Sequence, residues 1–318
     1  MREHLENKQV MIYIGIVILA TVVGLLAPTF SSTLNQWIEI VLAILMYSMF
    51  SQIPLTSLRQ GFKNRQFILA LCVTNFIAVP IVVFLLTRFL PNEPALLLGV
   101  SLVLLTPCID YVIVFTALGK GDAKAILLAT PILFALQMLL LPLYLWLFLG
   151  KKTMVIVEGG PFIEAFVLLI VLPLIVAVLI QLLAKKSKAG HQVIELSAWL
   201  PVPFMAATLF VIIASQMEKI TMDSDLIWKA VPIYIAFMVI MPLIARWIGQ
   251  LYKLEIGVKR ALVFSGGTRN SLVVLPLALA LPPTMNTVVV TIIVTQTLVE
   301  ILGELIYIKA VPSLIIKD

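Results

Sequence analysis

The chain has 318 residues, of which 62% are hydrophobic and only 12% are charged. Soluble domains are about 25% charged, so this composition excludes a soluble protein and indicates an integral membrane protein. The net charge of +6 does not indicate a nucleic-acid partner, because most Lys and Arg residues flank apolar runs, as membrane orientation requires.

The apolar runs predict an all-α membrane protein. Most runs are longer than about 18 residues, enough for a helix to cross a hydrocarbon core of about 30 Å. The ten-residue alternation of a transmembrane barrel is absent. With the lipid bilayer as the surrounding partner, we predict ten spans in chain order: roughly 10–28, 33–53, 67–89, 95–118, 123–148, 162–184, 195–216, 226–250, 258–281 and 285–309.

Several classes of protein and site are disfavoured by what the sequence lacks. The first apolar run is long and has no small-residue cleavage pattern, so no signal peptide is expected. Cys72 and Cys108 both lie in apolar runs, and no metal-ligand spacing exists, so we expect no disulfide, metal or cofactor. His4 and His191 lie outside the spans, which disfavours an enzyme. The absence of a phosphate-binding loop disfavours an ATPase, and no soluble domain is present through which a sensor would signal.

The distribution of basic residues predicts the orientation. With the N-terminus inside, cytoplasmic segments carry sixteen of the 22 Lys and Arg residues and the opposite side carries five, which leaves Arg269 inside the membrane. Basic residues concentrate on the cytoplasmic side of membrane proteins. We therefore expect a multi-pass protein of the inner (plasma) membrane with both termini in the cytoplasm.

The spans fall into two halves of five, residues 1–150 and 151–318. The fourth span of each half is interrupted, at 106–110 and at 265–270, and an odd number of spans gives the halves opposite orientations. Inverted repeats with paired broken helices are typical of secondary transporters, whose sites lie near the bilayer midplane. The repeat is inferred from hydropathy and from the positions of the breaks.

Helix-breaking residues account for the two interruptions. Pro107 has no N–H and clashes with the preceding turn, so it predicts a break in span four. The pair Gly266-Gly267 permits an unwound backbone in span nine. Freed backbone groups are tolerated at this depth only where they face protein or a water-filled cavity, and such groups also bind ions and polar substrates. The alternative is that both breaks only shape helix packing.

Two ionisable residues, Asp110 and Arg269, accompany these breaks. Counted from the cytoplasmic ends of their spans, their depths differ by only about 5 Å. A lone charge at this depth costs a few kcal/mol or more, so we expect the two side chains to face one another. Glu300 lies at a similar depth and is a rival partner for Arg269, whereas Glu304, one turn nearer the cytoplasm, is expected to reach the headgroups.

This pair has two interpretations. It is either a static ion pair that joins spans four and nine, or a pair with which a substrate or a proton competes. In the second interpretation, protonation of Asp110 frees Arg269 during alternating access.

The remaining polar residues of the spans carry less information. Cys108 follows the proline break, where a buried thiol is either a small apolar side chain or a ligand in the same cavity. Asn270 and Ser271, beside the second break, are candidate site residues, together with Ser265 before it. Asn75 and Gln296 are isolated in their spans and receive no weight.

At the two interruptions the sequence resembles the superfamily of bile acid:sodium symporters and arsenical-resistance (arsenite efflux) permeases. The resemblance covers essentially the whole chain. It is most specific from Pro107-Cys108 to Lys120-Gly121-Asp122, which aligns with the Pro-Cys opening and Arg-Gly-Asp ending of the arsenite permeases. The resemblance implies a bile acid:sodium symporter-like fold with core and panel domains, crossing helices four and nine, and a role in transport for Cys108.

The departures from the family pattern are informative. The arsenite permeases have a glutamate in span nine where this chain has Leu272. The positions of the symporters' sodium ligands are occupied here by Val112, Ile113, Ser265 and Arg269. An apolar pair and an arginine cannot coordinate sodium, so the resemblance implies that Arg269 acts as a built-in cation and that coupling is proton-linked. The string 268–276 is similar to that of bacterial members labelled arsenic-resistance proteins.

Two transport functions remain open. The first is export of trivalent arsenic or a related oxyacid, bound transiently by the Cys108 thiol and driven by the proton gradient. The alternative is transport of an organic anion, a bile-acid-like compound, carboxylate or sulfonate, bound by Arg269 and by helix N-termini. A channel is a third alternative, although paired broken helices with a blocking ion pair favour alternating access.

Overall fold

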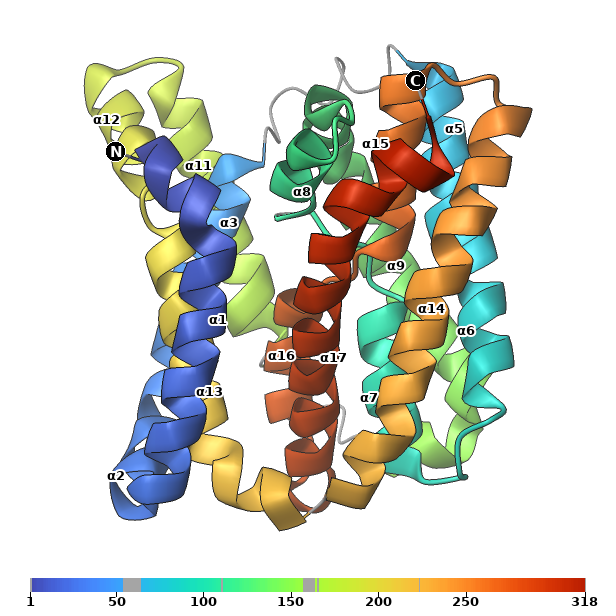
Figure 1. Ribbon diagram of the computed structural model, residues 1–318. Coiled ribbons are helices and arrows are strands. Elements are labelled where there is room, and N and C mark those ends of the chain that lie inside the picture. The colour runs from blue at the N-terminus through green and yellow to red at the C-terminus, as the bar shows by residue number, and fades with distance from the viewer. Residues whose placement is uncertain are drawn as a thin grey trace. The chain divides into compact units, whose positions relative to one another are not determined.

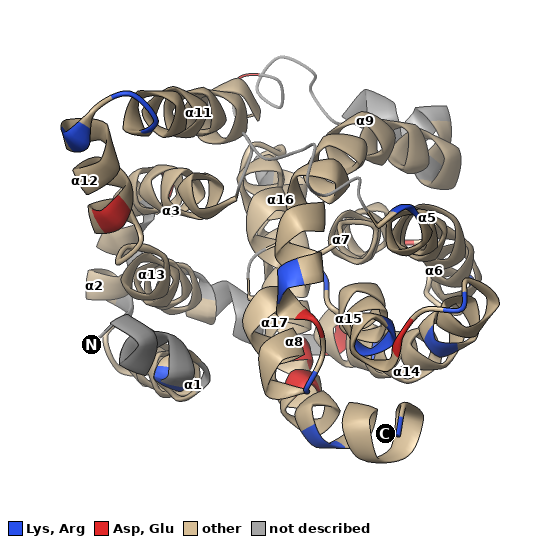
Figure 2. Cartoon of the chain, turned by 90° about the horizontal axis from the view of Figure 1, so that it is seen from above, with Lys and Arg blue, Asp and Glu red and all other residues tan. Residues whose placement is uncertain are grey.

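A computed structural model describes residues 2–53, 64–109, 111–156, 164, 166–222 and 224–317. Within these residues the chain is helical and has no β-strand, apart from one isolated bridge between Pro107 and Arg269. This confirms the predicted all-α class. Charged residues are sparse along the helices, as the colours of Figure 2 show, which agrees with a polytopic membrane protein.

Five helical segments of the described residues are long and apolar enough to cross a membrane, namely Arg65–Thr87, Ala123–Phe148, Val167–Ala184, Asp225–Leu251 and Thr284–Ile315. A sixth is formed if Lys188–Ser197 and Pro201–Ser215, bent by 43°, are taken together. These six coincide with six of the ten predicted spans. In three of the other four predicted spans the apolar helical stretches are shorter, Met11–Leu26, Ile38–Gln52 and Pro94–Leu104, and the fourth is divided between two short helices, so the number ten stays a prediction.

The chain divides into two compact units. The first comprises Met1–Thr56, Glu158–Ser224 and Pro276–Thr287, and the second comprises Ser57–Val157, Asp225–Leu275 and Val288–Asp318. Each unit draws segments from both halves of the sequence. This division by contacts does not test the predicted repeats 1–150 and 151–318, which stay a prediction.

The first unit is built on the packing of α1 (Arg2–Leu26) along α13 (Pro201–Met222), which Figure 1 shows in blue and yellow. Its other elements are α2 (Pro28–Thr33), η1 (Leu34–Trp37), α3 (Ile38–Gln52), η4 (Val167–Val171), α11 (Leu172–Ala184) and α12 (Lys188–Ser197). The Gln181 amide on α11 donates to the carbonyl of Ile53 at 2.8 Å, just after α3. This bond ties α11 to the end of α3, which it also packs against.

The second unit carries both interrupted spans. Its elements begin with α5 (Arg65–Val73), η3 (Thr74–Ala78), α6 (Val79–Thr87), α7 (Pro94–Leu104), α8 (Val112–Leu118) and α9 (Ala123–Ile156). They continue with α14 (Ser224–Leu251), α15 (Ile256–Gly267), α16 (Ser271–Leu279), α17 (Pro283–Ala310) and η5 (Val311–Ile315), where α14, α16 and α17 extend beyond the unit at one end. The buried α15 packs against α5, α8 and α9.

A turn of π-helix interrupts the segment from α5 to α6. It spans Thr74–Ala78, and its first three residues are buried. A π-helical turn accommodates one extra residue and is frequent at functional sites. The extra residue changes which side chains face the interior of the unit, and it directs Asn75 toward the end of α15.

Candidate functional site

The two interruptions of helix lie side by side and pair through their backbones. Helix α7 ends at Leu104 and α15 ends at Gly267. The N–H of Asn270 donates to the carbonyl of Thr106 at 2.8 Å, and the N–H of Cys108 donates to the carbonyl of Thr268 at 3.3 Å. Backbone groups freed by the breaks therefore satisfy one another, as buried backbone at membrane depth requires.

The antiparallel bridge places Pro107 opposite Arg269. Both hydrogen bonds come from the flanking residues, so the N–H that Pro107 lacks is not required. The N–H of Arg269 is equally unused by the bridge, and it donates to Glu300 Oε2 at 2.7 Å.

The glycine pair acts differently from the prediction. Gly266 and Gly267 were expected to unwind, but they form the last residues of α15, and the backbone leaves the helix only at Thr268. A Cβ on Gly267 would lie 2.6 Å from the ring of Tyr307, and one on Gly266 would lie 3.0 Å from Thr74. Glycine is thus required here for close packing of α15 against α17 and the π-helical turn.

The guanidinium of Arg269 closes the broken end of α15. Its Nη2 lies 2.5 Å from the carbonyl oxygen of Ser265, 2.9 Å from that of Gly266 and 2.8 Å from Oδ1 of Asn75. The last carbonyls of a helix have no partner within it and carry the negative end of the helix dipole. A cation held by three oxygens at this point stabilises a helix end in the middle of a membrane protein.

The face of the same guanidinium lies over the Phe237 ring, 5.5 Å from its centroid. Arg269 is fully buried, and its Nε has no partner among the described residues. One N–H of the buried cation is therefore not used by the contacts of these residues.

Two acidic residues were predicted as partners of Arg269, Asp110 and its rival Glu300. Asp110, its predicted partner, lies outside the described residues, so this pairing stays a prediction. Glu300, the predicted rival, contacts the backbone N–H of Arg269. Within the part of the chain that the structure describes, the hydrogen bonds of the guanidinium go to amide and carbonyl oxygens and not to a carboxylate. Two of these oxygens, from Ser265 and Gly266, belong to the preceding turn of α15, and the Asn75 oxygen comes from the π-helical turn.

Two carboxyl groups on α17 meet the second interruption. Glu300 is fully buried and also accepts from the hydroxyl of Tyr111 at 2.5 Å and from the amide of Gln296. Glu304 was expected to reach the headgroups, but its exposed fraction is 0%, and its Oε1 lies 2.8 Å from Oγ1 of Thr268. It faces the interior because α17 turns the face that carries both carboxyls toward the end of α15.

The other predicted residues lie around the point where the two interruptions pair, which we call the crossing. Cys108 is fully buried at the first interruption. The side chain of Asn270 accepts from the N–H of Val273 at 3.1 Å and so begins α16, while the hydroxyl of Ser271 lies 2.8 Å from that of Thr297 on α17. Ser265 contributes its carbonyl to Arg269 and accepts from Asn75 at its hydroxyl.

Three contributors were missed or dismissed from the sequence: Asn75, Gln296 and Tyr111. The first two were treated as isolated polar residues, yet both are buried, and they contact Arg269 and Glu300 respectively. The spacing of Gln296 and Glu300, four residues apart in one span, was a usable signal, since such residues share a helix face. No comparable signal exists for Asn75, because the π-helical turn determines its direction.

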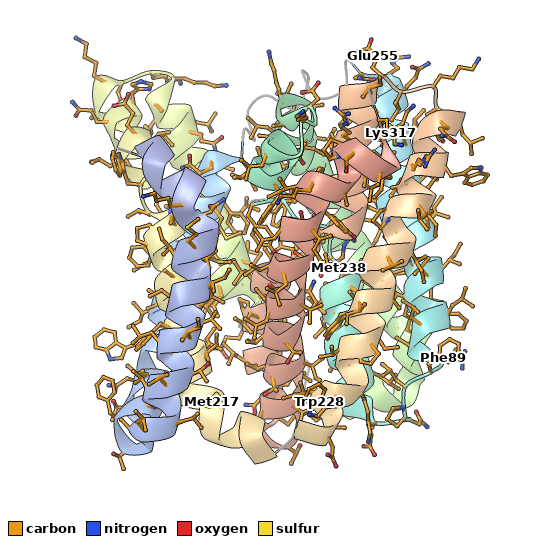
Figure 3. All side chains as sticks on the ribbon, in the orientation of Figure 1. Phe89, Met217, Trp228, Met238, Glu255 and Lys317 are labelled. Carbon is orange, nitrogen blue, oxygen red and sulfur yellow. The ribbon has the colours of Figure 1, made fainter. Side chains whose placement is uncertain are left out.

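The carbonyl of Met238 accepts from the Tyr307 hydroxyl, which joins α14 to α17 next to the glycine pair. In Figure 3, Met238 lies in the middle of α14, between Trp228 near one end and Glu255 beyond the other. The crossing is therefore near mid-height of the second unit. Among the described residues no group of three His, Cys, Asp or Glu side chains is arranged to hold a metal ion.

Comparison with known proteins gives two findings. A model described as Sodium Bile acid symporter family matches residues 39–224, more than half of the chain, which includes the first interruption. The Arsenical-resistance protein Acr3 of Alkaliphilus metalliredigens (strain QYMF) is 27% identical over 178 residues, 50% of this chain and 50% of that protein. The match thus spans about half the length of that relative. Both findings agree with the resemblance seen in the motifs.

Proposed function

The chain belongs to the Sodium Bile acid symporter family, and we propose that it is a secondary active transporter that exports arsenite or a related oxyacid. The observation that carries this proposal is the pairing of two broken helices beside a buried cation whose Nε has no partner among the described residues. Broken helices that meet in the middle of a membrane protein form the substrate and ion sites of secondary transporters. Membership of a symporter family also supports transport over catalysis.

We propose that coupling is proton-linked and does not use sodium at this crossing. Nη2 of Arg269 occupies the point where the carbonyls of Ser265 and Gly266 and the side chain of Asn75 converge. Unwound backbone carbonyls and helix C-termini are the groups that coordinate sodium in transporters with broken helices. A guanidinium that already occupies these oxygens supplies the positive charge permanently.

The substrate proposal rests on Cys108 and on the name of the relative. Trivalent arsenic is thiophilic, and the relative is named an arsenical-resistance protein. A single thiol beside the crossing binds arsenic reversibly, whereas several thiolates would retain it. In proteoliposomes, Cys108→Ser is expected to abolish arsenite counterflow. Unchanged counterflow would remove the thiol from the mechanism.

A second candidate is favoured by the Nε of Arg269, a buried donor with no partner among the described residues. An organic anion, such as a carboxylate or sulfonate, would satisfy it with a charge-assisted hydrogen bond. This function predicts that Arg269→Ala abolishes transport of the anion while Cys108→Ser leaves it intact. Counterflow with arsenite and with a panel of organic anions therefore separates the two candidates.

We also propose the finer architecture: ten spans in two inverted repeats, 1–150 and 151–318, in the inner (plasma) membrane with both termini in the cytoplasm. The support is the charge distribution along the sequence and the symmetric placement of the breaks. Reporter fusions at each predicted loop test the topology. Asp110 remains the proposed partner of Arg269, and normal transport by both Asp110→Asn and Arg269→Gln would exclude a role for that pair in coupling.

A further inference from the structure

Glu300 and Glu304 place two carboxyl groups one helical turn apart on α17, and both are fully buried. Residues four apart lie on the same face of a helix. Their hydrogen-bond partners differ in a way that distinguishes their protonation states.

Glu300 is surrounded by donors. The backbone N–H of Arg269 points at Oε2 from 2.7 Å. The Tyr111 hydroxyl lies 2.5 Å from Oε1 and 3.2 Å from the carbonyl oxygen of Arg269, so its proton lies toward the nearer acceptor, Glu300. The Gln296 amide contacts the same carboxyl. An ionised carboxylate only accepts hydrogen bonds, so this environment fits the charged form.

Glu304 has no such ring of donors among the residues that the structure describes. Its neighbour is the Thr268 hydroxyl, 2.8 Å away, but that hydroxyl also lies 2.6 Å from the carbonyl oxygen of Phe264. A hydroxyl has one proton, and a carbonyl oxygen can only accept. The Thr268 proton therefore lies toward Phe264, and the contact with Glu304 requires a proton from the carboxyl itself.

The ionisable groups around Glu304 also favour its protonated state. The ionisable groups that act on it are Glu300 and Tyr307, both on its own helix. Arg269 makes no ion pair with either carboxyl among the described residues, and the groups that face Arg269 besides Glu300 are Cys108, Tyr111 and Tyr307. Two adjacent buried carboxyls titrate as a coupled pair and do not both ionise. Asp110 is not among the described residues.

Two buried oxygens on α17 have no hydrogen-bond partner among the described residues, Oε1 of Gln296 and Oε2 of Glu304. The second oxygen of the Glu304 carboxyl is therefore not used by any described contact.

We propose that Glu304 is a proton-binding site, neutral in this conformation while Glu300 is ionised, and that its proton is the one exchanged during transport. On release the O–H bond breaks, the electron pair stays on the carboxylate, and the proton passes to water. The assignment of protonation stands alone, whereas the exchange rests on the proposed transport function.

Infrared spectroscopy of the purified full-length protein tests the protonation. A protonated, buried carboxylic acid gives a carbonyl stretching band that shifts in D2O. This band is expected in the wild type, lost in Glu304→Gln and kept in Glu300→Gln. The matched control is Glu195→Gln, which removes a glutamate that is 67% exposed. A band of equal intensity in wild type and Glu304→Gln would overturn the proposal. If Glu304→Gln does not fold, the band is measured in Glu304→Asp, which keeps a carboxyl: a shifted band is expected, and a band identical to that of the wild type would overturn the proposal.

Proteoliposomes test the exchange. An imposed pH gradient is expected to drive arsenite accumulation in the wild type and in Glu195→Gln, and to have no effect in Glu304→Gln, whose side chain cannot release a proton. An intact response to the gradient in Glu304→Gln would overturn the coupling role. If the wild type shows no counterflow with any substrate, the proposed function fails, while the infrared result still decides the state of Glu304.

Discussion

Replacement of Arg269 by glutamine tests whether the guanidinium occupies a cation site. The change removes the positive charge and leaves three oxygens, from Asn75, Ser265 and Gly266, converging on an emptied position. The carbonyl of Leu104, 3.5 Å from Nη1, lies beside it. We expect the protein to lose stability and to regain part of it when sodium is added.

The magnitude follows from the hydrogen bonds of Nη2. Its two hydrogens serve three oxygens, and a hydrogen bond to a charged group contributes about 1.5–3 kcal/mol, so the loss is about 3–6 kcal/mol. Removing the buried charge also removes its desolvation cost, which offsets part of this loss and leaves a net loss of about 2–4 kcal/mol. A change of this size lowers Tm by about 5–10 °C. Sodium at about 100 times its Kd would restore about 2.7 kcal/mol.

The assay is thermal unfolding of purified protein in sodium chloride and in choline chloride at equal ionic strength. Sodium is expected to raise the Tm of Arg269→Gln and to leave that of the wild type unchanged. Arg246→Gln, which removes an exposed arginine of α14, is the matched control and should show no sodium effect. Equal responses of Arg269→Gln and wild type to sodium would refute the idea that the guanidinium replaces a bound cation.

Two further changes test the packing of the crossing. Gly267→Ala places a Cβ 2.6 Å from the Tyr307 ring and is expected to lower the free energy of unfolding by about 1–3 kcal/mol. Its control is Gly257→Ala, whose Cβ meets nothing nearer than 3.8 Å. Equal unfolding temperatures of the two variants would contradict the close contact. Asn75→Leu removes an acceptor of Arg269 and should destabilise the protein by about 1–3 kcal/mol. If Asn75→Leu unfolds at the wild-type temperature, the guanidinium does not depend on that amide.

The membrane class and the positions of the interruptions were accessible from the sequence because their signals are local. Long apolar runs have one stable state in a bilayer, and Pro107 cannot continue a helix. From the sequence, Gly267 was expected to let the backbone unwind, whereas in the structure it leaves room for the Tyr307 ring. This steric requirement comes from a residue far away in the chain, so the sequence around Gly267 does not reveal it.

The partners of the buried charges were less accessible. Equal depth suggested Asp110 as the partner of Arg269, which stays a prediction, but depth did not reveal the oxygens that contact the guanidinium. The carbonyls of Ser265 and Gly266 are four and three residues before it, so they are within reach once the helix ends there. Glu304 was assigned to the surface from depth alone, yet the orientation of α17 determines its burial.

Two of the hydrogen bonds that join the interruptions belong to the main chain, from the N–H groups of Cys108 and Asn270. Side chains at 108, 268 and 270 take no part in these two bonds, so residues other than proline at 108 and 270 keep them. The geometry of the crossing can be inherited while the chemistry presented there is exchanged residue by residue. Relatives with different substrates are then expected to share this junction, and selectivity can be redesigned at these positions without a new scaffold.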